Sequence, residues 1–199
     1  MRKGLSISLG IVAIVLLASG IWLVKLIWLK PFNINHFYER VYIEFLWDDP
    51  EALTQTGILA PFGLSGHEAE LTDVSPKALE RLAKVGRENL RTLERYDRSS
   101  LSERSAVSYD VLHWFLKTGV EGEPFLFHDY PVTHISGPHI ETPQFLSGAH
   151  LIETKKDAQN YLNRLKGIDE KFGGLIDGLE RRRQLGVVAP TFILEQAIS

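Results

Sequence analysis

The chain has 199 residues, of which 44% are hydrophobic and 24% charged, and its formal net charge is -3. These values are typical of a folded globular protein, and they exclude a disordered tail, a collagen-like chain and a strongly basic nucleic-acid binder. The absence of cysteine excludes a disulfide scaffold, a Cys-ligated zinc or iron–sulfur site and a thiol nucleophile.

The first 30 residues differ in character from the rest of the chain. They contain four Lys or Arg side chains and no Asp or Glu, and the stretch Leu5–Val24 carries no charge at all. A helix of that length spans about 30 Å, the thickness of the hydrocarbon core of a bilayer. Trp22 and Trp28 lie where an interfacial aromatic belt is expected. Residues 1–30 are therefore predicted to be a cytoplasmic tip plus a transmembrane signal-anchor helix, with the lipid bilayer as partner.

The basic residues of this segment predict its orientation. Arg2 and Lys3 favour a cytoplasmic N-terminus, although Lys25 and Lys30 weaken that bias. The expected localisation is that of a single-pass membrane protein whose body lies outside the cytoplasm, in the periplasm or at the cell surface. The alternative is a cleavable signal peptide, because Ala18–Gly20 resembles a small-residue cleavage site.

Residues 31–199 are predicted to be mainly α-helical, because apolar residues recur in steps of three and four between recognisable start and stop residues. Thr154 and Asp157, for example, form the pattern of a capping box before the longest of these apolar series. The expected helices cover 35–47, 50–57, 76–96, 102–119, about 30 residues between 154 and 186, and 191–199. The helices 76–96 and 102–119 are expected to pack as an antiparallel hairpin.

Two segments are expected to be non-helical. Residues 58–74 contain Pro61, Gly63 and Gly66 and are predicted to be a loop. Residues 120–150 contain several Pro and Gly and are predicted to be long and irregular, with short edge strands as an alternative.

Three groups of polar residues are candidates for chemistry. His67-Glu68-Ala69-Glu70-Leu71 begins like the helix of a zinc metallopeptidase, but Leu71 stands where the second histidine ligand is required. A solvated acidic loop is the alternative. Arg181–Arg183 either complement the dipole at the end of a helix or bind an anionic partner. Four histidines lie close together in sequence and either bind a metal, contact substrate or order a loop: His128, His134, His139 and His150.

Several ordered stretches resemble the N-terminal part of the bacterial domain-of-unknown-function 885 family. The resemblance covers roughly residues 36–199. The stretches that carry it are Asp49–Thr54 with Gly57, Leu71–Pro76, Leu101-Ser102 with Tyr109–Leu112, Tyr130–Gly137, Tyr161–Leu165 and Gly186–Pro190.

That family is similar to thermolysin-like (gluzincin) zinc metallopeptidases, so the resemblance implies a peptidase-like parent whose zinc site lies in a C-terminal half. It implies no catalytic residue and no metal ligand in this sequence, and zinc as a cofactor only where that half is present. Residues 31–199 are accordingly interpreted as an incomplete helical N-terminal portion of a larger peptidase-like domain, inactive alone.

The stretch expected to lie nearest a peptide substrate begins at Tyr130. Extended segments can bind a peptide main chain by strand addition, and polar side chains on them add contacts. The residues predicted to face substrate are Tyr130, His134, Gly137 and His139. The alternative function is a single-pass membrane protein whose helical body is a non-catalytic interaction or scaffold module.

Overall fold

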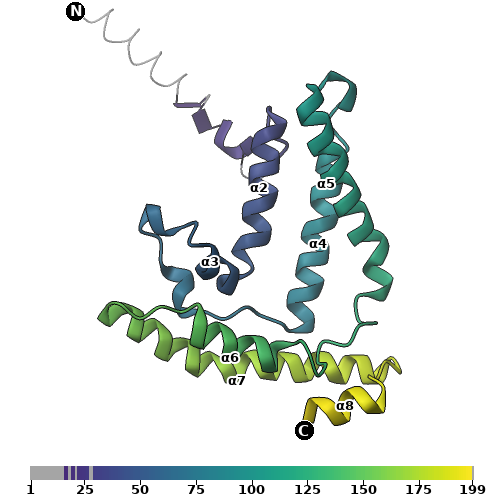
Figure 1. Ribbon diagram of the computed structural model, residues 1–199. Helices are drawn as coiled ribbons and strands as arrows, with labels where there is room; N and C mark the ends of the chain where they lie inside the picture. The colour runs from purple at the N-terminus through teal and green to yellow at the C-terminus, as the bar shows by residue number, and fades with distance from the viewer. Residues whose placement is uncertain (1–15, 18, 21, 27–28, 199) are drawn as a thin grey trace, which may run out of the picture. The chain divides into compact units, whose positions relative to one another are not determined.

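The computed structural model describes residues 16–17, 19–20, 22–26 and 29–198, and this part of the chain is mainly helical, as predicted, without a strand (Figure 1). The α-helices are α2 (Ile34–Trp47), α3 (Pro50–Thr56), α4 (Pro76–Leu93), α5 (Glu103–Gly122), α6 (Pro138–Gly148), α7 (Lys155–Gln184) and α8 (Thr191–Ile198). Short 3-10 helices are η1 (Ala60–Phe62), η2 (Gly66–Ala69), η3 (Arg98–Ser100) and η4 (Glu123–Phe125).

The chain forms two compact units, each made of two separate stretches of sequence. Unit 1 comprises residues 1–43 and 87–117, and unit 2 comprises residues 44–86 and 118–199. The helices α2, α4 and α5 each contribute residues to both units.

Unit 1 is organised around aromatic and aliphatic side chains. Phe37 and Leu93 are fully buried, and the ring centroids of Phe37 and Tyr96 lie 5.7 Å apart. The Tyr96 hydroxyl donates to the carbonyl oxygen of Pro31 at 2.7 Å, so this buried polar group is satisfied. Burial raises the pKa of Tyr96 to about 12, which keeps the hydroxyl a donor at neutral pH.

The hairpin predicted between helices 76–96 and 102–119 corresponds to α4 and α5, whose connected ends lie in unit 1. Glu94 Oε1 at the end of α4 lies 3.3 Å from His113 Nε2 on α5. In the turn between them, the Arg98 guanidinium donates two hydrogen bonds of 2.6 Å to the Asp110 carboxylate. These contacts connect the end of α4 to the first half of α5.

Two helices of unit 2, α3 and α7, begin and end close to the residues that the sequence indicated. The Asp49 side chain accepts from Ala52 N at 3.0 Å at the start of α3, and Gly57 ends α3 with a left-handed φ of 60°. At the start of α7, Thr154 and Asp157 form the predicted capping box. These local signals placed α7 to within one or two residues.

The prediction of an N-terminal transmembrane helix is wrong, and so is the single-pass membrane localisation that followed from it. No helix of the described part of the chain is long and apolar enough to cross a membrane. A spanning helix requires about 20 consecutive apolar residues. Of the predicted segment, residues 1–15, 18, 21 and 27–28 lie outside the described residues.

The described end of that segment makes polar contacts within unit 1. Lys30 Nζ donates to the carbonyl oxygen of Arg95 at 2.8 Å, and Arg40 donates to the carbonyl oxygen of Leu29 at 2.5 Å. Lys25 Nζ lies 3.9 Å from the centroid of the Phe32 ring. These contacts connect Lys25, Leu29 and Lys30 to other residues of unit 1.

The prediction of an irregular or short-β segment at residues 120–150 is wrong for much of its length. Residues 126–137 are irregular, but the segment has no strand and contains the end of α5, the 3-10 helix η4 and the whole of α6. Pro143 lies inside α6, where proline costs about 3 kcal/mol. Burial of Phe145 and Leu146, on a helix that lies along α7, offsets that cost.

Gly137 sets the start of α6 through its backbone conformation. Its φ of 128° and ψ of 167° lie in a region that side chains with a Cβ rarely adopt. A Cβ added there would lie 2.5 Å from the carbonyl oxygen of Pro131. Only glycine fits this position without a shift of the backbone.

Replacing Gly137 with Ala is therefore expected to lower the free energy of unfolding by about 1–3 kcal/mol. Gly148→Ala at the other end of α6 is the matched control, because a Cβ there meets nothing within 4 Å and its φ is not left-handed. Urea unfolding followed by circular dichroism measures both variants. Equal stability of the two would contradict the strain assigned to Gly137.

Candidate functional site

The most deeply buried polar group in the described part of unit 2 is the guanidinium of Arg164. Its side chain is 0% exposed and projects from the middle of α7. It donates to the Glu70 carbonyl at 2.9 Å, His150 Nδ1 at 2.5 Å, Thr54 Oγ1 at 2.6 Å, the His67 carbonyl at 3.1 Å and the Pro50 carbonyl at 3.4 Å. We call Arg164 and these five residues the Arg164 cluster.

The cluster joins four separate segments of unit 2. Pro50 and Thr54 belong to α3, His67 belongs to η2, and His150 follows α6. A planar guanidinium presents five donors in fixed directions, so one side chain can fix several carbonyls at once. The Phe145 ring lies 4.7 Å from the guanidinium carbon and covers it on one side.

Burial lowers the pKa of Arg164 to about 10, and the negative charges of Glu51, Glu68 and Glu70 oppose that shift. The hydrogen-bond acceptors of the guanidinium are backbone carbonyls, the Thr54 hydroxyl and the His150 imidazole. The charge is thus stabilised by oriented dipoles and by acidic groups at longer range.

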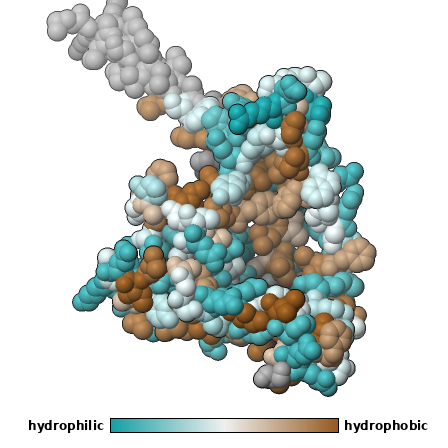
Figure 2. Space-filling model, viewed as in Figure 1, coloured by the Kyte–Doolittle hydropathy of each residue, from teal (hydrophilic) through white to brown (hydrophobic). Residues whose placement is uncertain are grey.

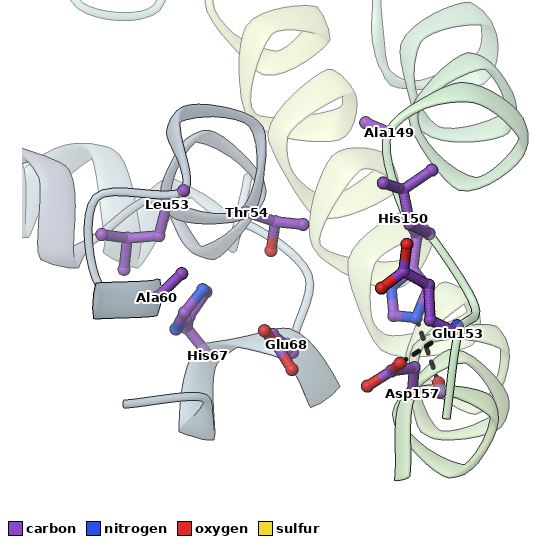
Figure 3. A pocket seen from close by; sticks show the side chains of 11 residues that line it. Leu53, Thr54, Ala60, His67, Glu68, Ala149, His150, Glu153 and Asp157 are labelled. Atoms are coloured by element: carbon purple, nitrogen blue, oxygen red, sulfur yellow. Dashed lines mark hydrogen bonds between the residues drawn. The ribbon is translucent and has the colours of Figure 1, made fainter. Parts of the chain in front are cut away.

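A cavity of about 340 Å³ opens beside the Arg164 cluster (Figure 3). His67 and Glu68 of η2 lie on one side of it, and His150, Glu153 and Asp157 lie on the other. Leu53 and Thr54 of α3 form a further wall. We call this space the η2 cavity.

The two imidazoles of the η2 cavity have different surroundings. His150 Nδ1 accepts from Arg164, so its Nε2 carries the hydrogen and donates to the Asp157 carbonyl oxygen at 3.1 Å. Burial lowers the pKa of His67, and the positive charge of Arg164 lowers it further.

The face of α7 that is turned inward is polar along much of its length. The Lys171 ammonium, which is 4% exposed, pairs with the Glu51 carboxylate at 2.6 Å. Nearer the end of the helix, Arg182 donates to Asp129 at 2.6 Å and 2.8 Å. The buried residues of α7 are Asn160, Arg164, Lys171, Leu175, Gly178 and Arg182.

The opposite side of α7 is apolar and exposed. Four large aliphatic residues share a sector about 100° wide at 3.6 residues per turn. Apolar residues also reach the surface over α6 and α7 in Figure 2. We call these four residues the outer α7 face: Leu162 (51% exposed), Leu165 (41%), Ile176 (63%) and Leu179 (38%).

The residues predicted to face substrate lie at the start of α6 and just before it. Tyr130 and His134 are exposed, Gly137 is buried, and His139 is half-buried. The Thr133–Ser136 turn is closed by a backbone hydrogen bond of 3.0 Å. The structure places these four residues in one local segment but outside the lining of the η2 cavity. Their role towards a substrate stays a prediction.

The candidate metal ligands of the sequence do not assemble. In the described residues, no three His, Asp or Glu side chains lie together so that they could hold a metal ion. The described residues therefore do not fit a zinc site. Two of the candidates, His67 and His150, lie on opposite sides of the η2 cavity, which their separation of 83 positions in sequence did not indicate.

Arg164 is the residue that the chemical motifs missed. An arginine in a charged helix is usually solvent-exposed, and no pattern of polar residues marks it. It does lie in the stretch Tyr161–Leu165, and its partners Pro50 and Thr54 lie in Asp49–Thr54. Both stretches carried the family resemblance, and that resemblance was the available signal.

Replacing Arg164 with Met is expected to lower the free energy of unfolding by about 3–5 kcal/mol, because the buried acceptors lose their donor. Arg183→Met is the control on the same helix, since Arg183 forms an exposed pair with Glu180 and little change is expected. Chemical denaturation measures both. A loss below about 1 kcal/mol for the Arg164 variant would contradict the anchoring role.

Comparison with known proteins assigns the chain to a family. A family model described as "Bacterial protein of unknown function (DUF885)" matches residues 50–199. No curated protein and no solved structure matches the chain. The matched region contains α3, η2, α6 and α7, and thus the whole Arg164 cluster. Because the match covers most of its length, the chain belongs to the DUF885 family of bacterial proteins of unknown function.

Proposed function

We propose that this chain is a non-catalytic helical portion of a zinc-metallopeptidase-like protein, and that its outer α7 face packs against the portion that carries the zinc site. The observation that carries the proposal is the distribution of side chains on α7. Its buried face holds Arg164, Lys171 and Arg182, whereas the four aliphatic side chains of the outer α7 face are exposed.

The energetics of α7 support a further packing partner. A helix of a globular protein usually buries its apolar stripe and exposes its charges. On α7 the four large aliphatic side chains of the outer α7 face are exposed, so the free energy available from burying them is not realised within unit 2. At about 25 cal/mol per Å² of apolar surface, covering this face would contribute several kcal/mol.

In the described residues, no three His, Asp or Glu side chains lie close enough together to hold a metal ion. The family resemblance implies that a zinc site of such a protein would be made by other residues. No catalytic step is therefore assigned to this chain.

The second candidate function is a non-catalytic interaction or scaffold module. Two ion pairs within unit 2, Lys171–Glu51 and Arg182–Asp129, favour this alternative. They attach α7 to the rest of unit 2 without the help of a second protein segment. This alternative predicts a monodisperse chain that binds little hydrophobic dye. The first function predicts dye binding and self-association through the outer α7 face.

The two functions are separated by replacing Leu162, Leu165 and Ile176 together with Gln in the full chain. For the first function, the triple variant binds less hydrophobic dye and self-associates less, with an unfolding midpoint near that of the unaltered chain. The control is Leu175→Gln, which removes a buried residue of the same helix (6% exposed) and is expected to cost about 2–5 kcal/mol of stability.

The partner is tested with a separately expressed DUF885 segment that contains a His-Glu-x-x-His helix. Sedimentation of the mixture is expected to show a one-to-one complex that the triple variant weakens at least tenfold. The first function is excluded if the complex forms equally well with the triple variant. The scaffold module is favoured if no complex forms and the chain is monodisperse and does not bind the dye.

A further inference from the structure

The η2 cavity has the dimensions and lining of a binding site for a small molecule. Its volume of about 340 Å³ falls within the range of ligand pockets. Its wall on one side is anchored by His150, which is 8% exposed and bonded at both ring nitrogens. A wall fixed in this way is preorganised, so little ordering is needed when a ligand enters.

The charge of the cavity is negative. Glu68, Glu153 and Asp157 line it, and in the described part of the chain none of its lining residues is Lys or Arg. The Asp157 carboxylate accepts from the backbone N–H groups of Glu153 at 3.1 Å and Thr154 at 2.8 Å. These bonds lower the pKa of Asp157, so it stays ionised at neutral pH. The buried Arg164 offsets only part of this charge.

The imidazoles do not reverse the sign. His150 Nδ1 accepts a hydrogen bond from Arg164, and burial lowers the pKa of His67, which disfavours a positive charge on that ring. An anionic ligand would therefore meet carboxylates without a free counter-charge on the lining. A cation would meet charges of opposite sign in a partly enclosed space, where their attraction is screened less than at the surface.

The shape of the lining narrows the class of cation. Figure 3 shows the carboxylates of Glu68 and Glu153 on opposite sides of the same space. Glu68 Oε2 accepts from Asn160 at 3.2 Å, which holds this carboxylate in place and leaves Oε1 for another donor. Leu53, Ala60 and Leu151 add apolar surface to the lining. This combination suits an ammonium group on a short hydrocarbon stem.

We propose that the η2 cavity binds a primary ammonium group on an aliphatic stem, with Glu68 and Glu153 as its counter-charges. Such a group is supplied either by a lysine side chain or by a free amino terminus. The inference concerns residues of α3, η2 and the α6–α7 connection, and it does not depend on what covers the outer α7 face.

The test uses the full chain and calorimetric titration at pH 7.5 with two amines. Nα-acetyl-lysine N-methylamide carries only the side-chain ammonium, and leucinamide carries only the α-ammonium. At least one is expected to bind one-to-one with a dissociation constant below about 1 mM. The amine that binds more tightly identifies the source. Nα,Nε-diacetyl-lysine N-methylamide, which lacks the charge, is expected to bind at least tenfold more weakly.

Matched variants assign the binding to the cavity. Glu68→Gln and Glu153→Gln keep the size of each side chain and are each expected to weaken binding at least fivefold. Glu170→Gln, an exposed carboxyl of α7 outside the η2 cavity, is expected to leave binding unchanged. The proposal is overturned if neither amine binds, if the uncharged analogue binds equally well, or if Glu68→Gln and Glu153→Gln bind as the unaltered chain does.

Discussion

A single buried guanidinium determines how the segments of unit 2 meet. Arg164 takes its acceptors from α3, from η2 and the residue that follows it, and from the α6–α7 connection, so each of these segments is positioned by the same group. Oriented carbonyls and three nearby glutamates offset part of the cost of burying the charge, and the lowered pKa of about 10 reflects the part that remains. The η2 cavity is lined by the segments that Arg164 holds together. Polar anchoring by this residue adds to the burial of apolar side chains such as Leu53, Phe145 and Leu175.

The helices could be predicted from the sequence wherever a local rule dominates. Asp49, Gly57, Thr154 with Asp157 and Gly186 mark helix ends through their own side chains or φ angles, so α3 and α7 were located closely. The sequence misled where tertiary packing overrides a local rule. Pro143 was expected to break any helix, yet α6 continues through it because Phe145 and Leu146 are buried. Hydrophobicity alone also predicted a spanning helix before Pro31, which the described residues do not contain.

The candidate site could be predicted only in part, and the reason is that its parts are distant in sequence. His67 and His150 were singled out separately for their chemistry, but nothing in their spacing places them around one cavity. Arg164 contacts both histidine segments, but it lies outside the apolar series of its helix, where a solvent-exposed residue is expected. The stretches Asp49–Thr54 and Tyr161–Leu165 were noticed for their resemblance to a family, and the structure shows that they meet at Arg164. Family patterns thus pointed to the centre of unit 2 more directly than motifs of catalytic residues did.

The polar inward face of α7 has a consequence for how this protein responds to temperature. The heat capacity change on unfolding scales with the apolar surface that becomes exposed, and polar surface reduces it. α7 buries Asn160, Arg164, Lys171 and Arg182, whereas the aliphatic residues of its outer face are already in water, so its detachment exposes less apolar surface than that of an ordinary core helix. The contribution of α7 to the heat capacity change on unfolding is accordingly expected to be small. The attachment of α7 to α3 and η2 depends instead on hydrogen bonds. Guanidinium ions in solution compete for such hydrogen bonds.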